Sequence, residues 1–168
     1  HRLLLEYADE IIYGLKAIIK AVDAPKGVIV IEDNKPDAIA IFQEKLAGET
    51  AIELVTAKTK YPQGAEKMLI KRVTGRMVPS GGLPADVGCV VHNVETVLAV
   101  YRAVAESIPL IRRVITVTGD CVVNPQNIQV CFGTSFEELL EAAGGIDGEA
   151  ELFIAGGPMR GIALEDLT

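Results

Sequence analysis

The stretch KTKYPQGAEKMLIKRVTG, residues 58–75, combines residue types that could hold an anionic ligand. Tyr61 can border a planar ring, Gly64 lets a ligand approach the backbone, and Glu66 can accept hydrogen bonds from ribityl or ribose hydroxyls. Lys67 belongs to a cluster of bases that raises the local positive potential. A plain strand-to-helix turn with solvated lysines explains the same residues, so the pattern alone leaves both interpretations open.

A second candidate group is HNVET, residues 92–96. Asn93 and Thr96 are three residues apart, which puts both on the first turn of a predicted helix that starts after Asn93. Simple N-capping already accounts for Asn93. His92 is more typical of a surface or capping residue than of a catalytic one. The sequence contains no G-x-G-x-x-G motif, P-loop or catalytic triad pattern, and we predict no catalytic side chain.

The segments around residues 58–75 predict how that stretch is positioned. Residues 2–22 repeat apolar side chains at three- and four-residue steps and predict one helix. GVIVIED (27–33) and IELVTA (52–57) are continuous apolar runs, typical of strands buried on both faces. The helix between them spans 36–46, with Asn34 as its expected cap, Pro36 in its first turn and Gly48 closing it.

This strand–helix–strand pattern predicts a parallel βαβ unit. Residues 58–65 then follow the carboxyl end of a parallel strand, the edge at which open α/β sheets bind ligands. Residues 65–73 predict a helix that ends at Gly75. Gly64 therefore lies at the start of a helix, where free N–H groups favour an anion. Residues 76–92 are rich in glycine and proline and predict a long ordered loop.

The second part of the chain has a different pattern. Residues 114–120 and 127–132 predict a β-hairpin, Ser135 and Glu138 form an S-x-x-E capping box before a short helix, and residues 151–157 predict a further strand. This order suits a small β-grasp module. We place the domain boundary near Pro109, which divides the chain into 1–109 and 110–168.

Composition narrows the function. The 168 residues carry a net charge of −7, which argues against a nucleic-acid surface. No apolar run is long enough to span a membrane. Cys89, Cys121 and Cys131 form no C-x-x-C pair, so no metal site is predicted, and buried, reduced thiols in a cytosolic protein are expected. The opening HRLLLEYADE has neither methionine nor a signal peptide, so a fragment is expected.

The motifs together resemble the RnfC family of the Rnf electron-transport complexes, which is similar to the flavin subunit of respiratory complex I. KYPQGAEKMLIKRVTGRMVPSGGLPADVG, HNVET, VTVTGD and GGPM occur here in the order found in that family, and the resemblance spans nearly the whole chain. It implies a modified Rossmann-like domain that binds FMN and NADH, followed by a β-grasp domain that binds a soluble ligand. The family's glycine-rich flavin loop would lie before this segment, and its iron–sulfur clusters after it.

The resemblance transfers residue by residue only in part. Tyr61, Gly64 and Glu66 match a Tyr-x-x-Gly-Glu-Glu run beside the flavin, with Ala65 in place of the first glutamate. Asn93 and Thr96 match an Asn-Asn-x-x-Thr run at the flavin phosphate, with His92 in place of the first asparagine. In GGPMRG, Arg160 stands where a second methionine is expected. The implied cofactor-binding residues are Tyr61, Gly64, Glu66, Lys67, His92, Asn93 and Thr96.

The resemblance implies electron transfer from NADH through FMN to iron–sulfur clusters, in a complex on the inner face of the cell membrane. The expected partners are NADH and other subunits, with no nucleic acid and no membrane span in this chain. Two alternatives remain. The chain is a soluble relative, such as a cobalamin reductase or the electron-transfer protein of proline reduction, or it is a docking module without its own catalysis.

Overall fold

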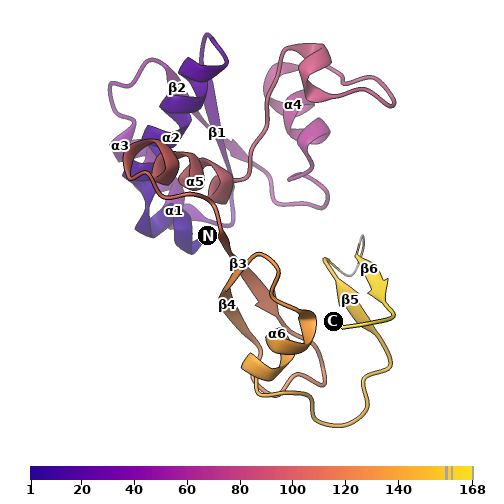
Figure 1. Cartoon of the computed structure of the whole chain (residues 1–168). Helices are drawn as coiled ribbons and strands as arrows, with labels where there is room; N and C mark the ends of the chain where they lie inside the picture. Colours follow the sequence, from indigo (N-terminus) through magenta and orange to yellow (C-terminus); the bar gives the residue numbers. More distant parts are fainter. Residues whose placement is uncertain (158, 160, 168) are drawn as a thin grey trace. The chain divides into compact units, whose positions relative to one another are not determined.

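The computed structural model divides the chain into two compact units, His1–Pro109 and Leu110–Thr168 (Figure 1). It describes all residues except 158, 160 and 168. The first unit contains α1 (Arg2–Glu6), α2 (Ala8–Ala21), β1 (Gly27–Glu32), α3 (Pro36–Lys45), β2 (Ile52–Ala57), α4 (Glu66–Thr74), the 3-10 helix η1 (Pro84–Val87) and α5 (Val94–Ala105). The second contains β3 (Arg112–Val117), β4 (Gln126–Cys131), α6 (Phe136–Ala142), β5 (Phe153–Ala155) and β6 (Ile162–Leu164).

The predicted βαβ unit is confirmed. β1 and β2 pair in parallel, with Gly27 opposite Ile52 and Glu32 opposite Ala57, and α3 connects them. The prediction that both faces of each strand are buried is wrong. Buried and half-buried residues alternate along β1, and Glu53 and Thr56 of β2 are exposed. Each strand of a two-stranded sheet has an open edge, so its second face is only partly covered.

The first helical segment differs from its prediction. Residues 2–22 form two helices rather than one, because Tyr7 leaves the helical region at φ −127° and ψ 35°. The ring of Tyr7 lies 5.4 Å from the guanidinium carbon of Arg102 on α5, and both side chains are half-buried. A long-range contact of this kind is invisible to helical periodicity.

The start of α3 is also corrected. The residue before α3 is Lys35, no side chain caps the helix, and Asn34 instead accepts a hydrogen bond from Lys35 Nζ at 2.8 Å. Pro36 does occupy the first turn, as predicted. The helix ends at Lys45, and Gly48 lies beyond its end with a positive φ of 85°.

The core of the first unit lies between the helices α2, α3 and α5 and the sheet. Phe42 of α3 and Leu98 of α5 are its two largest fully buried side chains. Gly14 allows α2 to approach α5 closely, because a Cβ at this position would lie 2.2 Å from the carbonyl oxygen of Val97. Tyr13 and Tyr101 meet edge to face at 5.3 Å beside this contact. The core therefore fixes α5.

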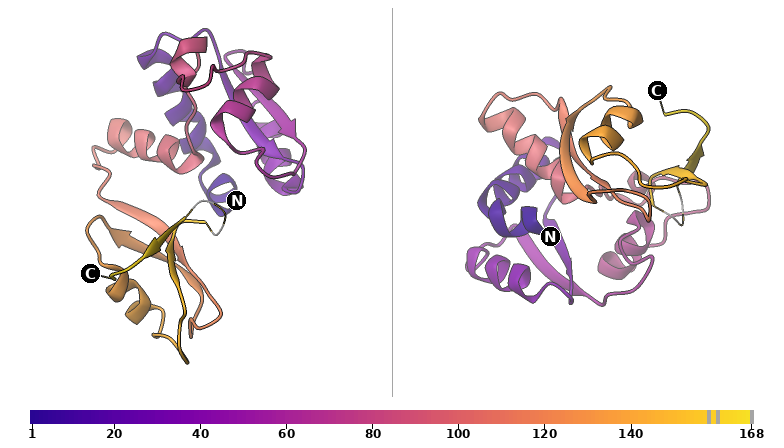
Figure 2. Two further views of the ribbon diagram at one scale, coloured as in Figure 1. Left: turned by 90° about the vertical axis from the view of Figure 1, so that its right-hand side faces the viewer. Right: turned by 90° about the horizontal axis from the view of Figure 1, so that it is seen from below.

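Helix α4 is not part of this core. Its buried residue, Ile70, lies outside the core cluster, and α4 packs against η1. α4 lies apart from α2 and α5 in Figure 1, and Figure 2 shows the same separation from two further directions. The region predicted as a loop, 76–92, thus contains a short helical turn that supports α4. Among the described helices, none has the length and apolar character to cross a membrane.

The second unit contains the predicted hairpin. β3 and β4 pair antiparallel, with Ile115 opposite Ile128. The capping box is confirmed, since Ser135 N donates to Glu138 Oε2 at 2.9 Å and Glu138 N donates to Ser135 Oγ at 3.2 Å. The last predicted strand is shorter than 151–157, and β6, which pairs with β5, was not predicted. The Pro158 and Arg160 positions of the GGPMRG motif lie outside the described residues.

The cysteine prediction is corrected in one respect. All three thiols are free, but Cys89 and Cys121 are half-buried and Cys131 is exposed. The second unit buries few side chains completely, with Leu139 and Ala143 among them. Its cysteines therefore have no deep core in which to lie.

Candidate functional site at the starts of two helices

The carboxyl edge of the β1–β2 sheet is held by Asp33. Its N–H extends the ladder by donating to the Ala57 carbonyl at 2.8 Å. Its carboxylate accepts from Thr59 N at 3.0 Å and Thr59 Oγ1 at 2.7 Å. These bonds, and the charge of Lys58, lower the pKa of Asp33. The first residues after both strands are thereby tied together.

The connection from β2 to α4 is a tight turn. Gln63 N donates to the Lys60 carbonyl at 2.8 Å, and Ala65 N donates to the Pro62 carbonyl at 2.9 Å. Gln63 is buried, with 7% of its surface exposed, whereas Tyr61 is 68% exposed. The turn therefore presents the tyrosine ring outward while the glutamine holds the loop against the unit.

Gly64 lies immediately before the start of α4. A Cβ at this position would meet nothing within 4 Å, and its φ is not in the left-handed region. The fold itself thus does not require a glycine here. Ala65, the N-cap residue, provides no side-chain cap for α4. The result is an open space beside a helix start whose N–H groups face no capping side chain.

The electrostatics of this region are positive. Between residues 58 and 76 the sequence carries six lysines and arginines against one acid, Glu66. Both Glu66 and Lys67 are exposed on the first turn of α4. An anion approaching this helix start meets the dipole and the lysines together.

The second predicted group lies at the start of α5. Asn93 is its N-cap residue, as predicted, and Asn93 Oδ1 accepts from Glu95 N at 3.0 Å. The cap uses Oδ1, so the Nδ2 donors are the part of Asn93 suited to a ligand. His92 is exposed and Thr96 is half-buried. Since Val97 and Leu98 are core residues, this helix start is held rigidly.

The structure therefore gathers the predicted residues into two groups, each at the start of a helix of the first unit. Tyr61, Gly64, Glu66 and Lys67 surround the start of α4, and His92, Asn93 and Thr96 surround the start of α5. The η1 segment, packed against α4, connects the two. That both groups contribute to one pocket stays a prediction.

Two residues of this region were missed by sequence reasoning, Asp33 and Thr59. Each is a polar residue that follows a predicted parallel strand, Asp33 after β1 and Thr59 after β2. The carboxyl ends of adjacent parallel strands meet at one edge, so this pattern was the available signal. Gln63, also missed, is distinguished only by its burial.

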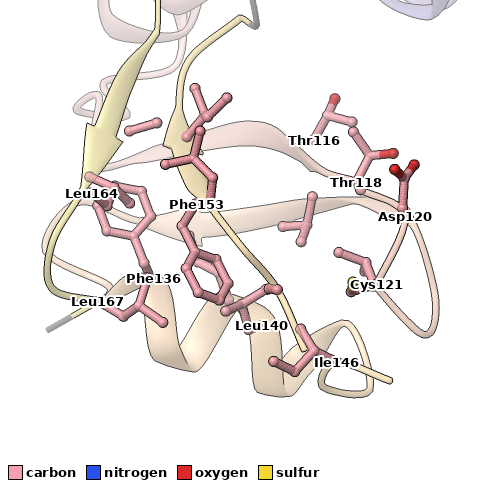
Figure 3. A pocket seen from close by; sticks show the side chains of 18 of the residues that line it. Thr116, Thr118, Asp120, Cys121, Phe136, Leu140, Ile146, Phe153, Leu164 and Leu167 are labelled. Atoms are coloured by element: carbon pink, nitrogen blue, oxygen red, sulfur yellow. The ribbon is translucent and has the colours of Figure 1, made fainter. Parts of the chain in front are cut away.

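The second unit has a separate cavity of about 870 Å³ between its hairpin, α6 and β5 (Figure 3). Thr116, Thr118 and Asp120 lie on one side of it, whereas Phe136 and Phe153 give the other side an apolar surface. The cavity is suited to an apolar molecule with a polar end. It contains none of the residues predicted from the sequence.

Comparison with protein families matches both units. The Nuo51 FMN-binding domain family matches residues 1–102, and the SLBB domain family matches residues 114–163. The first match includes both helix starts described above. The second covers the hairpin, α6 and β5.

Curated relatives match almost the whole chain, and all three named here are RnfC proteins. That of the proton-translocating ferredoxin:NAD(+) oxidoreductase complex of Clostridium ljungdahlii is 47% identical over 99% of this chain. The Na(+)-translocating counterpart of Acetobacterium woodii is 43% identical over 96% of it, and that of the ion-translocating oxidoreductase complex of Pseudomonas aeruginosa is 40% identical over 99%. The chain spans 36%, 37% and 21% of these three proteins, respectively.

Among solved structures, an NAD+-reducing [NiFe]-hydrogenase in the H2-reduced state has a similar fold. The TM-score is 0.72, the sequence identity is 21%, and the match covers 99% of this chain and 35% of that one. The air-oxidised state of an NAD+-reducing [NiFe]-hydrogenase gives a TM-score of 0.73. At this identity the likeness concerns the fold alone.

Proposed function

Since the chain belongs to the Nuo51 FMN-binding domain family, we propose that its first unit, residues 1–109, forms part of an FMN- and NADH-binding site. The parallel βαβ unit would be the Rossmann-like part of that domain, and residues 110–168 would be a β-grasp domain of the SLBB family. The site would be completed by regions of the longer protein, because the chain spans only about a third of its Clostridium ljungdahlii relative.

The observation that carries the proposal is the open space at Gly64. A glycine that the fold does not need lies at an uncapped helix start, beside the carboxyl edge of a parallel sheet. This combination fits a phosphate-bearing cofactor, because backbone N–H groups and the helix dipole would face the anion while the missing side chain leaves room for it. Lys67 would add positive charge at the same end of the helix.

The other residues have complementary roles. Tyr61, exposed beside Gly64, would border the flat ring, and Glu66 would accept hydrogen bonds from ribityl or ribose hydroxyls. Asn93, through Nδ2, and Thr96, through its hydroxyl, would donate to phosphate oxygens, with His92 as a further polar contact. The residues present therefore fit the group, with Ala65 unable to supply the acidic contact expected from the family.

FMN, when bound, would supply the redox chemistry by taking a hydride from NADH and releasing electrons singly to iron–sulfur clusters. The chain's own residues would bind and orient it, and none needs to act as acid or base. We propose that the whole protein is a peripheral, cytoplasmic subunit of an Rnf-type membrane complex, with iron–sulfur clusters outside this segment. The relatives named above belong to such complexes, which favours this function over a cobalamin reductase or a proline-reduction protein.

A substitution at Gly64 in the full-length protein tests the proposal. Gly64→Val should weaken FMN binding at least tenfold, since the side chain would occupy the open space, while thermal unfolding stays unchanged. Gly157→Val is the matched control, because a Cβ at Gly157 also meets nothing within 4 Å. FMN affinity is measured by the change in flavin fluorescence on titration. Equal affinities for the two variants would refute the proposed site.

A further inference from the structure

The charge of this chain is unevenly distributed. Residues 58–76 carry six lysines and arginines and a single acid, a net charge of +5, in a chain whose total is −7. The remainder of the chain therefore has a net charge of −12. A segment this basic in an acidic protein calls for a local explanation.

The cations of α4 also differ from those elsewhere in how they are paired. Arg2, Lys16, Lys26, Lys35 and Lys45 each form an ion pair with an acid of the first unit. Within the part of the chain that the structure describes, Lys67, Lys71 and Arg72 of α4 have no such partner. Their charges are available to something outside this chain.

These cations share one face of α4. Lys67 and Lys71 are four residues apart, as are Met68 and Arg72, so the four side chains form two adjacent rows along the helix. All four are exposed, with Met68 at 41%, whereas Ile70 faces inward with 3% exposed. We call these four residues the outer face of α4.

We propose that the outer face of α4 is a docking surface for an acidic patch on another protein of the assembly. The three cations supply charge complementarity, and Met68 at their centre supplies an adaptable apolar contact of the kind enriched in interfaces. The proposal rests on the proposed function, which makes the full-length protein a member of an assembly of several subunits.

The cofactor phosphate does not explain this face. The phosphate would bind at the start of α4, whereas Lys71 lies five residues further on, about 7 Å along the axis. Compensation of the helix dipole explains a cation in the last turn. It does not explain an exposed methionine among three cations without an acid on the same face.

An anionic membrane surface fits less well than a protein. A helix that lies on a membrane buries a wide apolar face in the lipid. The remaining apolar residues of α4 are not available for this, because Ile70 is buried and Leu69 and Val73 are half-buried within the unit. Only Met68 would enter the bilayer.

The test uses the full-length protein in its complex, immobilised through a tag on another subunit and washed with increasing NaCl. The docking variant is Lys71→Glu/Arg72→Glu, which spares Lys67 and therefore the proposed cofactor site. The control is Lys20→Glu/Lys45→Glu, which changes the net charge equally and also replaces cations in last helical turns. The amount of retained protein and its FMN content are measured for each.

The docking variant should bind the rest of the complex at least tenfold more weakly at about 50 mM NaCl, with the difference shrinking towards 0.5 M as salt screens the charges, roughly as expected for exposed ion pairs. The control variant should behave like wild type, and FMN content should be equal in all three. Retention of the docking variant equal to the control would overturn the proposal while leaving the proposed function intact. Failure of wild type itself to bind the other subunits would refute both.

Co-sedimentation with phosphatidylglycerol vesicles separates the remaining possibility. The proposal predicts equal, low binding of wild type and the docking variant to these vesicles. Strong vesicle binding by wild type that the docking variant loses would assign the outer face of α4 to lipid and overturn the protein partner.

Discussion

The carboxylate of Asp33 accepts two hydrogen bonds from Thr59, 26 residues away, at 3.0 Å from the backbone N and 2.7 Å from Oγ1. This pair joins the segments that leave β1 and β2 at the carboxyl edge of the sheet. Thr59 is two residues before Tyr61, so the pair also anchors the loop that carries the candidate cofactor residues. Both hydrogen bonds favour the ionised carboxylate.

The Asp33–Thr59 pair should make stability depend on pH. The pKa of Asp33 in the folded protein is below the ordinary value of 3.8, so the ionised group stabilises the fold at pH values above 3.8. This contribution is lost as the pH falls through the folded pKa. Urea unfolding of Asp33→Asn should therefore lose less stability than wild type when the pH is lowered from about 5 to about 3. The exposed carboxylate variant Glu44→Gln is the control, and a profile for Asp33→Asn identical to wild type would contradict the assignment.

Gly14→Ala should destabilise the first unit. The added Cβ would lie 2.2 Å from the Val97 carbonyl oxygen, which is backbone and cannot move without shifting α5. We expect a loss of about 1–3 kcal/mol in the free energy of unfolding, typical of overpacking. Gly64→Ala is the control, because its Cβ meets nothing within 4 Å and should leave stability nearly unchanged. Denaturant unfolding followed by circular dichroism measures both, and equal stabilities would refute the close packing of α2 on α5.

Ser135→Ala should destabilise the second unit. The Ser135 hydroxyl accepts from Glu138 N at 3.2 Å, and its loss leaves that donor of α6 without its cap. The cost expected for an N-cap serine is about 1 kcal/mol. Ser80→Ala, in an exposed loop of the first unit, should have no comparable effect. Thermal unfolding of both variants checks this, and Glu138→Gln should retain most of the stability because glutamine can also complete a capping box.

Residues 1–168 alone should bind FMN weakly or not at all. In the family that this chain resembles, the flavin site has two halves, and the glycine-rich loop of the first half is absent from this sequence. The half present here is open, since Tyr61 is 68% exposed beside Gly64. Each missing charge-assisted hydrogen bond would cost about 1.5–3 kcal/mol, and every 1.4 kcal/mol is about tenfold in affinity. Titration of FMN followed by fluorescence decides the point, and tight stoichiometric binding would disprove the two-half arrangement.

Limited proteolysis should cut the chain between residues 106 and 111. Ser107 adopts a positive φ of 58°, and the neighbouring Ile108, Leu110 and Ile111 are exposed. This segment joins the two compact units and has few contacts to protect it. Mass spectrometry of the first fragments identifies the site. Initial cleavage inside α5 or β3 would indicate that the two units are not separable domains.

The sequence by itself determined the features whose partners lie close together in the chain. The parallel pairing of β1 with β2 follows from an apolar run, a helix and a second apolar run within about 30 residues. The caps formed by Asn93 and Ser135 link residues two or three positions apart, so both partners are visible in the sequence. Such local interactions form in any fold that contains the helix.

The tertiary structure decided features that depend on distant residues. Tyr7 interrupts the predicted first helix and contacts Arg102, and α4 packs against η1 outside the core, which no periodicity indicates. The bond between Asp33 and Thr59 exists only after β1 and β2 pair in register and bring their ends together. Periodicity and capping signals describe one element at a time, whereas these contacts depend on how the elements pack.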